Sequence, residues 1–246
     1  MELTFFDARV WKYVITGIAK VVKETVVRIN EEGFRIRTMD EAKVVLIDFF
    51  IPSDAFETFE VEGETSFGVN LEEMARVVRR ATKEDKISIH VGESTYSIIF
   101  IGHGERKFTL PQLDVAEEEI PEPSIEFNNM VVLRSDAYRE LVKDLETIAD
   151  TVTFHLEPGT LRVEAKSDLG YAEVIIPEDS GVILEQEVSE SAKSSYSIEY
   201  LTYVSSVSQV ADKVKLELGN DMPLQATFEI GESGRLLYLV APRIED

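Results

Sequence analysis

The chain has 246 residues, enough for one large domain or for two domains of about 120 residues each. Hydrophobic residues make up 44% of it, a share typical of folded proteins, and the lack of cysteine excludes disulfides, thiolate metal sites and a cysteine nucleophile. Its 25 basic and 47 acidic residues give a net charge of −22, which by itself argues against binding to nucleic acid. The positions of the basic residues therefore matter more than the total charge.

The sequence shows no targeting or membrane signal. Met1 to Lys20 carries charges throughout and lacks the apolar stretch of a signal peptide. The longest apolar run, Val44 to Pro52, is interrupted by Asp48 and is far shorter than the roughly 20 residues that span a bilayer. We therefore expect a soluble, intracellular protein without membrane contact, in the cytoplasm of a cell without a nucleus or in a nucleus.

The first half of the sequence predicts a helix, three strands and a second helix. The first helix is expected from Asp7 to Lys23, where apolar side chains recur with the period of one helix face. From Thr25 to Ile51, two strands of alternating apolar and polar residues flank a turn at Gly33, and a third strand follows. The second helix is expected from Leu71 to Lys83. More strands follow it, with a hairpin turn at Gly102 to Glu105.

The second half of the sequence repeats the first. Leu71 to Gly92 matches Ile198 to Gly219, 127 residues later, in its apolar positions, its Asp-Lys step and its closing glycine. Thr25 to Ile51 matches Thr151 to Ile176 in the same way. A chain that repeats one pattern along its whole length consists of two copies of one domain.

A fourth helical segment completes the repeat. It is expected from Ser135 to Ala149, with Ser135 as its N-cap and Asp136 in its first turn. Each half then consists of a helix, three or more strands, a second helix and further strands. Four helices and a majority of strands predict an α+β fold with long antiparallel sheets, built from two topologically similar domains.

An acidic segment separates the two halves. Ala116 to Pro123 has the sequence AEEEIPEP, and its two prolines disfavour both helix and sheet. An extended surface connector is therefore expected here. The predicted divisions are an N-terminal domain at residues 1–115, a connecting linker at 116–126 and a C-terminal domain at 127–246.

Basic residues gather on one face of each helix in the first half. They fall opposite the apolar stripe, on the first helix at Arg9, Lys12, Lys20 and Lys23 and on the second at Arg76, Arg79, Arg80 and Lys83. An ordinary exposed face mixes both signs, whereas Glu72 is the only acid in line with these residues. The alternative is two solvated faces, since lysine and arginine suit exposed helical positions. We favour a surface that contacts phosphates without reading the base sequence.

The sequence contains no catalytic or metal-binding motif. His90 and His155 lie on predicted strands and His103 in the hairpin turn, and none has the spacing of metal ligands. P-loop, nucleophile-elbow and HExxH patterns do not occur. The acidic residues lie mostly in turns and in the linker. The sequence therefore predicts a protein that is not an enzyme and that needs no metal or cofactor.

Several motifs, in order along the whole chain, resemble one family. They are the Met39-Asp40 turn, the helix pattern from Asn70 to Ala81, Asp114-Val115 before Ile120-Pro121, Gly219 with Pro223-Leu224, and the tail from Arg235 to Asp246, RLLYLVAPRIED. In these residues the sequence resembles the proliferating-cell-nuclear-antigen type of DNA sliding clamp. The resemblance implies three two-domain subunits in a ring, with helices lining the hole and sheets outside. The implied function is to encircle duplex DNA and to confer processivity on DNA polymerase.

The resemblance also implies partners and site residues. The implied partners are double-stranded DNA, bound without sequence preference, and DNA polymerase, clamp loader, flap endonuclease and DNA ligase, bound through short peptide motifs. The basic residues named above, together with Arg139 and Lys143, would face the DNA. A pocket for the client peptides would comprise Met39, Lys43, Ile120, Pro223, Leu239, Ala241 and Pro242. Subunits would pair through the strands Arg106, Lys107, Phe108, Thr109, Leu110 and Tyr171, Ala172, Glu173, Val174, Ile175, Ile176.

The sequence departs from the family pattern at a few positions. Leu239 stands where the family often has tyrosine, and Glu118 where its linker often has an apolar residue. Ser206 and Glu199 stand where positive residues often occur, so a ring of this chain with paralogous subunits is an alternative to three identical copies. Two other functions remain open on the residues alone: an acidic protein-interaction scaffold without DNA contact, and a carboxylate-dependent nuclease of α+β class.

Overall fold

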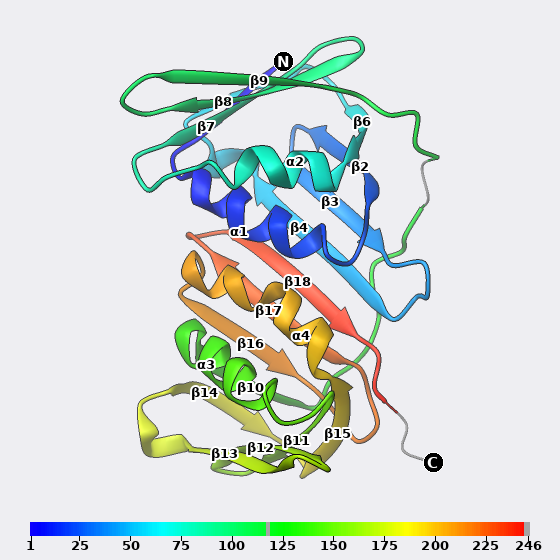
Figure 1. The fold of residues 1–246 in the computed structure, drawn as a ribbon, viewed down its shortest axis with the longest axis vertical. Helices are drawn as coiled ribbons and strands as arrows, with labels where there is room; N and C mark the ends of the chain where they lie inside the picture. Colours follow the sequence, from blue (N-terminus) through cyan, green and yellow to red (C-terminus); the bar gives the residue numbers. More distant parts are fainter. Residues whose placement is uncertain (117–118, 244–246) are drawn as a thin grey trace. The chain divides into compact units, whose positions relative to one another are not determined.

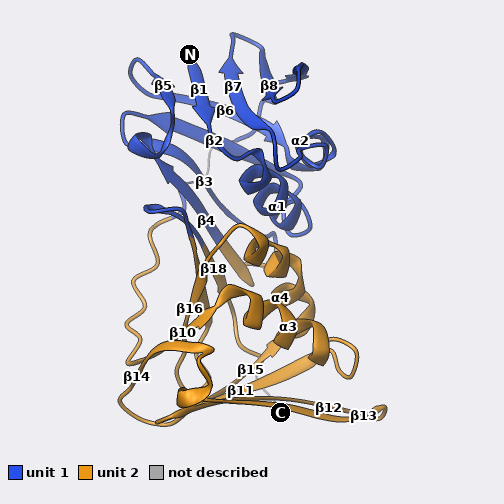
Figure 2. Cartoon of the chain, turned by 90° about the vertical axis from the view of Figure 1, so that its left-hand side faces the viewer, with its two compact units in different colours: residues 1–41, 47–120, 230–236 blue, residues 42–46, 121–229, 237–246 orange. Residues whose placement is uncertain are grey.

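The computed structural model describes residues 1–116 and 119–243, and the chain divides into two compact units, coloured separately in Figure 2. Unit 1 comprises residues 1–41, 47–120 and 230–236. Unit 2 comprises residues 42–46, 121–229 and 237–246. No helix in the described part of the chain is both long enough and apolar enough to cross a membrane.

In unit 1, helices α1 (Ala8–Ile18) and α2 (Leu71–Val78) contact each other along one side of the strands (Figure 1). One group of hydrogen-bonded strands has the order β5-β1-β7-β8-β9, and β4, β3, β2 and β6 are neighbours in a second group. The strands are β1 (Glu2–Phe5), β2 (Glu24–Asn30), β3 (Gly33–Met39), β4 (Val45–Pro52), β5 (Thr58–Glu60), β6 (Thr65–Asn70), β7 (Lys86–Val91), β8 (Thr95–Ile101) and β9 (Glu105–Pro111). The short helix η1 (Ser53–Ala55) precedes β5.

In unit 2, helices α3 (Ser135–Leu145) and α4 (Ile198–Ser205) contact each other in the same way. One group of strands has the order β13-β12-β11-β15, and β14, β10, β16 and β17 are neighbours in another. The strands are β10 (Asn129–Arg134), β11 (Thr151–Glu157), β12 (Thr160–Ser167), β13 (Gly170–Pro177), β14 (Ile183–Val188), β15 (Ala192–Ser197), β16 (Lys213–Glu217) and β17 (Leu224–Ile230). Short helices η2 (Glu178–Ser180) and η3 (Ser206–Gln209) and the last strand, β18 (Gly234–Val240), complete the chain.

The repeat found in the sequence is also present in the structure. Helix α2 begins at Leu71 and α4 at Ile198, while β7 begins at Lys86 and β16 at Lys213, so both pairs are separated by 127 residues. The order of α-helices and strands is the same in both halves, and the second half has in addition the short helix η3 after α4. The predicted α+β class, with antiparallel strand pairing and two similar domains, is confirmed.

Trp11 on α1 lies at the centre of the unit 1 core. Its buried ring is 5.0 Å from Phe5, 5.6 Å from Phe34 and 6.0 Å from Phe49, measured between ring centroids. The apolar stripe predicted for this helix is buried as well, at Val10, Val14, Ile15 and Ile18. Each such side chain contributes about 1.5–3 kcal/mol when buried. The inner face therefore fixes α1 and leaves its outer face to polar residues.

The first helix is shorter than predicted. Asp7 caps it, since its carboxylate accepts a hydrogen bond from the Arg9 amide at 2.9 Å. The helix ends at Ile18 instead of Lys23, and the amides of Lys20 and Val21 donate only three residues back, to the carbonyls of Gly17 and Ile18 at 3.2 and 2.9 Å, as in a tightened last turn. Lys20 and Lys23 therefore lie outside the helix.

Ser135 is not the N-cap of α3, as the sequence suggested, but its first helical residue. Its buried hydroxyl lies within hydrogen-bond distance of the carbonyl oxygens of Ser208, at 3.1 Å, and Ala211. Asp136 does lie in the first turn. The helix ends at Leu145, before the predicted end at Ala149. Ser135 therefore joins two distant segments of unit 2 instead of closing its own helix.

Candidate nucleic-acid interface

Two basic side chains of α1 are bound within unit 1. Arg9 forms a two-point ion pair with Asp7, in which Nε lies 3.0 Å from Oδ1 and Nη2 lies 2.8 Å from Oδ2. Lys12 Nζ donates to the carbonyl oxygen of Ala81 at 3.0 Å and lies 5.8 Å from the centre of the Tyr13 ring. The charge of Arg9 is therefore offset by a carboxylate, whereas Lys12 keeps its positive charge because its partner is neutral.

Three arginines cluster at the C-terminal end of α2. Arg76 lies in the last turn, Arg79 is the C-cap residue and Arg80 follows it. Their side chains are exposed and form no ion pair with another described residue. The helix dipole favours cations at this end and acids such as Glu72 and Glu73 in the first turn, which explains Arg76. Arg79 and Arg80 extend the positive charge beyond the helix.

The second helix ends at Val78, so the basic face predicted along it up to Lys83 is wrong in this detail. Only Arg76 belongs to the helix itself. Lys83 lies in the following turn, where it is exposed and 3.7 Å from a carboxylate oxygen of Glu84. The predicted residues still share one short segment, but a turn presents most of them.

Lys20 and Lys23 lie in the connection between α1 and β2, and both are exposed. The Lys23 carbonyl accepts a hydrogen bond from the Leu71 amide at 2.7 Å, which brings this connection to the N-terminal end of α2. Unit 1 therefore brings the basic residues predicted in its half onto α1, α2 and the two segments that follow these helices.

The corresponding helices of unit 2 carry a different charge. On α3, Lys143 is exposed and Arg139 half-buried, but the acids Glu140 and Asp144 are exposed beside them. Helix α4 contains no basic residue and carries the exposed acid Glu199. The helices of unit 1 therefore present a more positive surface than those of unit 2, and such a surface is better suited to contact phosphates.

Two edge strands present unpaired backbone groups within their units. β9 is the last strand of the group β5-β1-β7-β8-β9, and β13 is the first of the group β13-β12-β11-β15. On β13, Tyr171 and Ile175 are each 55% exposed. On β9, Lys107 points to solvent, but the Arg106 side chain folds onto its own unit and lies 5.1 Å from the centre of the Phe100 ring. Exposed edges of this kind are suited to pairing with another chain.

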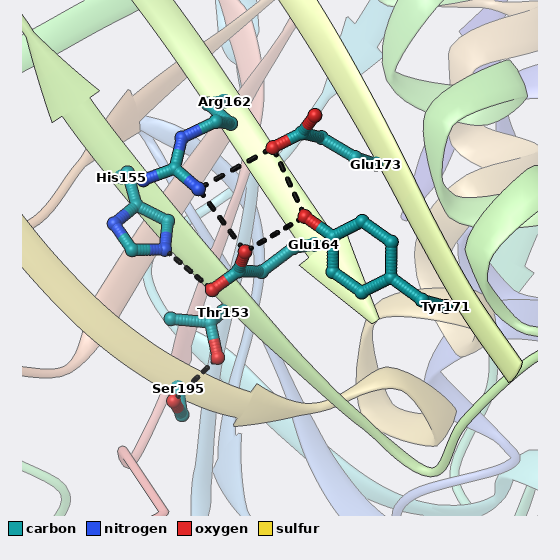
Figure 3. A network of polar contacts seen from close by, with 7 residues as sticks. All are labelled: Thr153, His155, Arg162, Glu164, Tyr171, Glu173 and Ser195. Carbon is teal, nitrogen blue, oxygen red and sulfur yellow. Dashed lines mark hydrogen bonds and ion pairs between the residues drawn. The ribbon is translucent and has the colours of Figure 1, made fainter. Parts of the chain in front are cut away.

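A polar network joins β13 to its neighbours (Figure 3). Glu164 lies at its centre and accepts hydrogen bonds from His155 Nε2 at 2.9 Å, Arg162 Nη1 at 3.0 Å and the Tyr171 hydroxyl at 3.1 Å. The hydrogen bond from His155 is the main cause that lowers the pKa of Glu164. The single hydroxyl proton of Tyr171 is shared with Glu173, whose Oε1 lies 3.0 Å from the hydroxyl oxygen. The network fixes the exposed side of β13 against β12 and β11.

Models of the two domains of proliferating cell nuclear antigen match nearly the whole chain. The N-terminal domain matches residues 1–119 and the C-terminal domain residues 119–243. The chain belongs to the proliferating cell nuclear antigen family. The resemblance found in the sequence is confirmed.

Relatives and solved structures agree with this assignment. The chain is 35% identical to the DNA polymerase sliding clamp of Thermofilum pendens and 34% identical to DNA polymerase sliding clamp 1 of Pyrobaculum aerophilum, over 98% or more of each chain. Its structure matches PCNA from Thermococcus kodakaraensis with a TM-score of 0.91 and 27% identity, covering 98% of this chain and 99% of that one. It matches a chain of the PCNA2–PCNA3 complex from Sulfolobus tokodaii with a TM-score of 0.93 and 28% identity over 100% of both.

The residues that the family resemblance assigns to a client pocket fall in both units. Met39 and Ile120 belong to unit 1 and are half-buried; Glu118, the linker departure, lies outside the described residues. The other five belong to unit 2: Lys43, Pro223, Leu239, Ala241 and Pro242.

Backbone strain occurs next to the assigned residues of unit 2. Lys43 has a φ of 55° and Asp221, two residues before Pro223, a φ of 52°. They are the non-glycine residues with positive φ in the described part of the chain, and such residues often mark functional sites. Beside Lys43, the Val44 carbonyl accepts a hydrogen bond from the Ala241 amide at 2.8 Å. This bond joins the segment of Lys43 to the tail of the chain.

The histidines of this clamp-family chain have structural surroundings. His90 on β7 lies 3.6 Å from a carboxylate oxygen of Glu2, His155 belongs to the β13 network, and His103 lies in the β8–β9 turn. The described residues contain no group of three or more histidine and acidic side chains arranged to hold a metal ion.

The sequence did not predict the contacts that hold the basic turn of unit 1, residues 79–85, in place. Asp85 accepts hydrogen bonds from Thr82 and Arg106, and Lys12 binds the carbonyl of Ala81. The Asp-Lys step that recurs in both halves marks a related backbone contact. In both units the carbonyl of its aspartate accepts a hydrogen bond from the first residue of a helix, Ala8 to Asp85 at 2.9 Å and Ser135 to Asp212 at 3.1 Å.

Proposed function

We propose that this chain is a subunit of a DNA sliding clamp, which encircles duplex DNA and tethers DNA polymerase and other replication and repair proteins. Its role is non-enzymatic: it supplies processivity by topological linkage. Membership of the family and relatives named as DNA polymerase sliding clamps support this function.

The observation that carries the proposal is the exposed arginine cluster at the end of α2 in a chain with a net charge of −22. Cations on rigid elements attract phosphates but read no base edges, so the contact is independent of sequence and weakened by salt. The acidic remainder of the surface opposes binding of DNA elsewhere. The proposed DNA-facing residues are Arg9, Lys12, Lys20, Lys23, Arg76, Arg79, Arg80, Lys83, Arg139 and Lys143.

Client proteins would bind the pocket assigned by the resemblance, through short peptides with apolar anchors. The two positive-φ residues in unit 2 support a functional role for this region, since strained backbone persists only where its surroundings hold it. We assign residues 116–126 to the linker between domains 1–115 and 127–246. The described part of this linker contains neither helix nor strand.

Subunits would join through β9 of one copy and β13 of the next. Both are edge strands, and the exposed Tyr171 and Ile175 on β13 would otherwise favour aggregation. Head-to-tail pairing of two different edges closes a ring when the rotation per subunit fits, here into a trimer. The neighbour is a second copy of this chain or a paralogous subunit.

Clamp-dependent DNA synthesis tests the proposal. Native mass spectrometry should give a particle of three subunits, and loading of the protein onto a primed circular template should lengthen the products of its polymerase. Replacing Arg76, Arg79 and Arg80 with alanine should weaken this stimulation while leaving client-peptide binding intact, and replacing Leu239 and Pro242 should do the reverse. The same defect in both sets, or metal-dependent cleavage of DNA by the pure protein, would contradict the proposal.

A further inference from the structure

The turn after α2, residues 79–85, is closed from inside by a buried carboxylate. Asp85 is 4% exposed, and its Oδ2 accepts hydrogen bonds from the Thr82 amide at 2.7 Å and the Thr82 hydroxyl at 2.9 Å. Burial by itself raises the pKa of Asp85, but the hydrogen bonds from Arg106 and Thr82 outweigh burial and lower it, so the carboxylate is charged at neutral pH. This charge holds a turn that presents Arg79, Arg80 and Lys83.

Arg106 binds the same turn from the edge strand β9. Its Nη2 donates to Asp85 Oδ2 at 2.5 Å, and its Nη1 donates to the Arg80 carbonyl oxygen at 3.3 Å. The guanidinium also lies over the buried Phe100 ring, which fixes its orientation. One side chain of β9 therefore contacts both ends of the basic turn.

The repeat offers an internal comparison. Asp212 corresponds to Asp85 and keeps the backbone hydrogen bond to the first residue of its helix. Its side chain, however, is exposed and forms no hydrogen bond or ion pair with another described residue. A domain of the same topology thus folds without the carboxylate–arginine link, so the fold alone does not explain why unit 1 has it.

We propose that Asp85 and Arg106 are positioning residues that couple the edge strand β9 to the basic turn of residues 79–85. Pairing of β9 with a neighbouring subunit holds Arg106 in place and thereby stabilises the turn in its phosphate-binding conformation. By linkage, duplex DNA strengthens subunit association by the same factor. The inference rests on the proposed clamp function, and it adds that closure of the ring and its grip on DNA depend on each other.

Three variants separate this coupling from plain electrostatics. Asp85→Asn removes a negative charge, so charge alone predicts tighter binding to DNA, whereas the coupling predicts weaker binding. Arg106→Gln breaks the link from the other side and serves as the second test if the Asp85 variant does not fold. Lys193→Gln is the matched control, because it removes one positive charge from an exposed strand position that lies outside the turn and outside the proposed subunit, pocket and DNA-facing residues.

The experiment combines native mass, amide hydrogen exchange and binding to a short duplex at low salt, on full-length protein. In the native protein, exchange in residues 79–85 should slow when the ring assembles. Both linking variants should lose this response, and as assembled rings they should bind the duplex roughly threefold to tenfold more weakly, a range expected for coupling residues. Lys193→Gln should behave like the native protein.

The proposal is overturned if an Asp85→Asn ring binds the duplex as tightly as the native ring does. It is also overturned if amide hydrogen exchange in residues 79–85 of the native protein does not change when the ring assembles. Failure of the clamp function itself would look different. In that case the unaltered protein would neither assemble nor bind duplex, and substitution of Arg76, Arg79 and Arg80 would change nothing.

Discussion

Arg35 on β3 holds Asp48 on β4 through two hydrogen bonds of 2.8 Å, from Nε to Oδ1 and from Nη2 to Oδ2. Arg37 Nη2 adds a third, to Oδ2, at 2.9 Å. Asp48 is only 2% exposed and is the residue that interrupts the longest apolar run of the sequence. The two arginines therefore compensate the negative charge of a buried carboxylate. Substitutions at this ion pair test how much it contributes to the stability of unit 1.

Replacing Asp48 with asparagine should destabilise the protein by about 2 kcal/mol, because it leaves two arginines beside a buried position without their carboxylate. The partial exposure of Arg35 keeps the loss below that of a fully buried pair. Urea unfolding measures the change. Lys86→Gln, which breaks the exposed ion pair with Glu57, is the control and should cost less than about 1 kcal/mol. Equal losses in both variants would refute this account.

Acid should destabilise unit 1 through the same carboxylate. Burial raises the pKa of Asp48, but hydrogen bonds from Arg35 and Arg37 outweigh it and lower the pKa below its ordinary value of 3.8. A lowered pKa contributes stability that is complete above the ordinary value and is lost as the pH falls through the folded-state pKa. The free energy of unfolding should therefore decrease as the pH falls below about 4. Asp48→Asn should show a smaller drop, and an unchanged pH profile in this variant would contradict the assignment.

The salt dependence of DNA binding should report the arginines at the end of α2. Each phosphate contact contributes about 0.9 to the slope of log K against log salt, so replacing Arg76, Arg79 and Arg80 with glutamine should lower the slope by roughly 2 to 3. Replacing three exposed lysines of the strands, Lys86, Lys166 and Lys193, removes the same charge and serves as the control. A slope that falls equally in both triple variants would mean that only net charge matters.

Two glycines in one hairpin should respond differently to alanine. A Cβ on Gly102 would lie 2.6 Å from Asp85 Oδ1 and 3.2 Å from the Glu84 carbonyl oxygen, whereas a Cβ on Gly104 would meet nothing within 4 Å. Gly102→Ala should therefore cost about 1–3 kcal/mol by crowding Asp85. Gly104→Ala should stay within about 0.5 kcal/mol. Thermal unfolding of the two variants checks this, and similar melting temperatures would show that Asp85 can move freely.

The class and repeat of the fold could be predicted because they depend on periodic patterns. Buried stripes such as Val10 to Ile18 and the matched glycine turns are local signals that survive in both halves. Helix ends were predicted less well. The turn after Ile18 depends on backbone bonds, and the role of Ser135 depends on carbonyls more than 70 residues away in the sequence.

The basic residues of the first two helices could be predicted from helical periodicity, but the contacts that hold them in place could not. The family resemblance assigns Arg106 to a subunit contact, and only the folded structure brings it to Asp85. The helical period predicts that Lys12 lies on an exposed face, yet its Nζ donates to the carbonyl oxygen of Ala81. Pairings between residues so far apart in the sequence leave no periodic signal.

The unequal charge of the two units has a geometric consequence for a closed ring of three such chains. Three cationic sectors, each formed by α1 and α2, would alternate with three sectors of mixed charge formed by α3 and α4. A duplex inside such a ring would be drawn off the central axis toward one sector at a time. It would then have three equivalent resting positions, a third of a turn apart, and sliding would involve steps between them as well as travel along the helix.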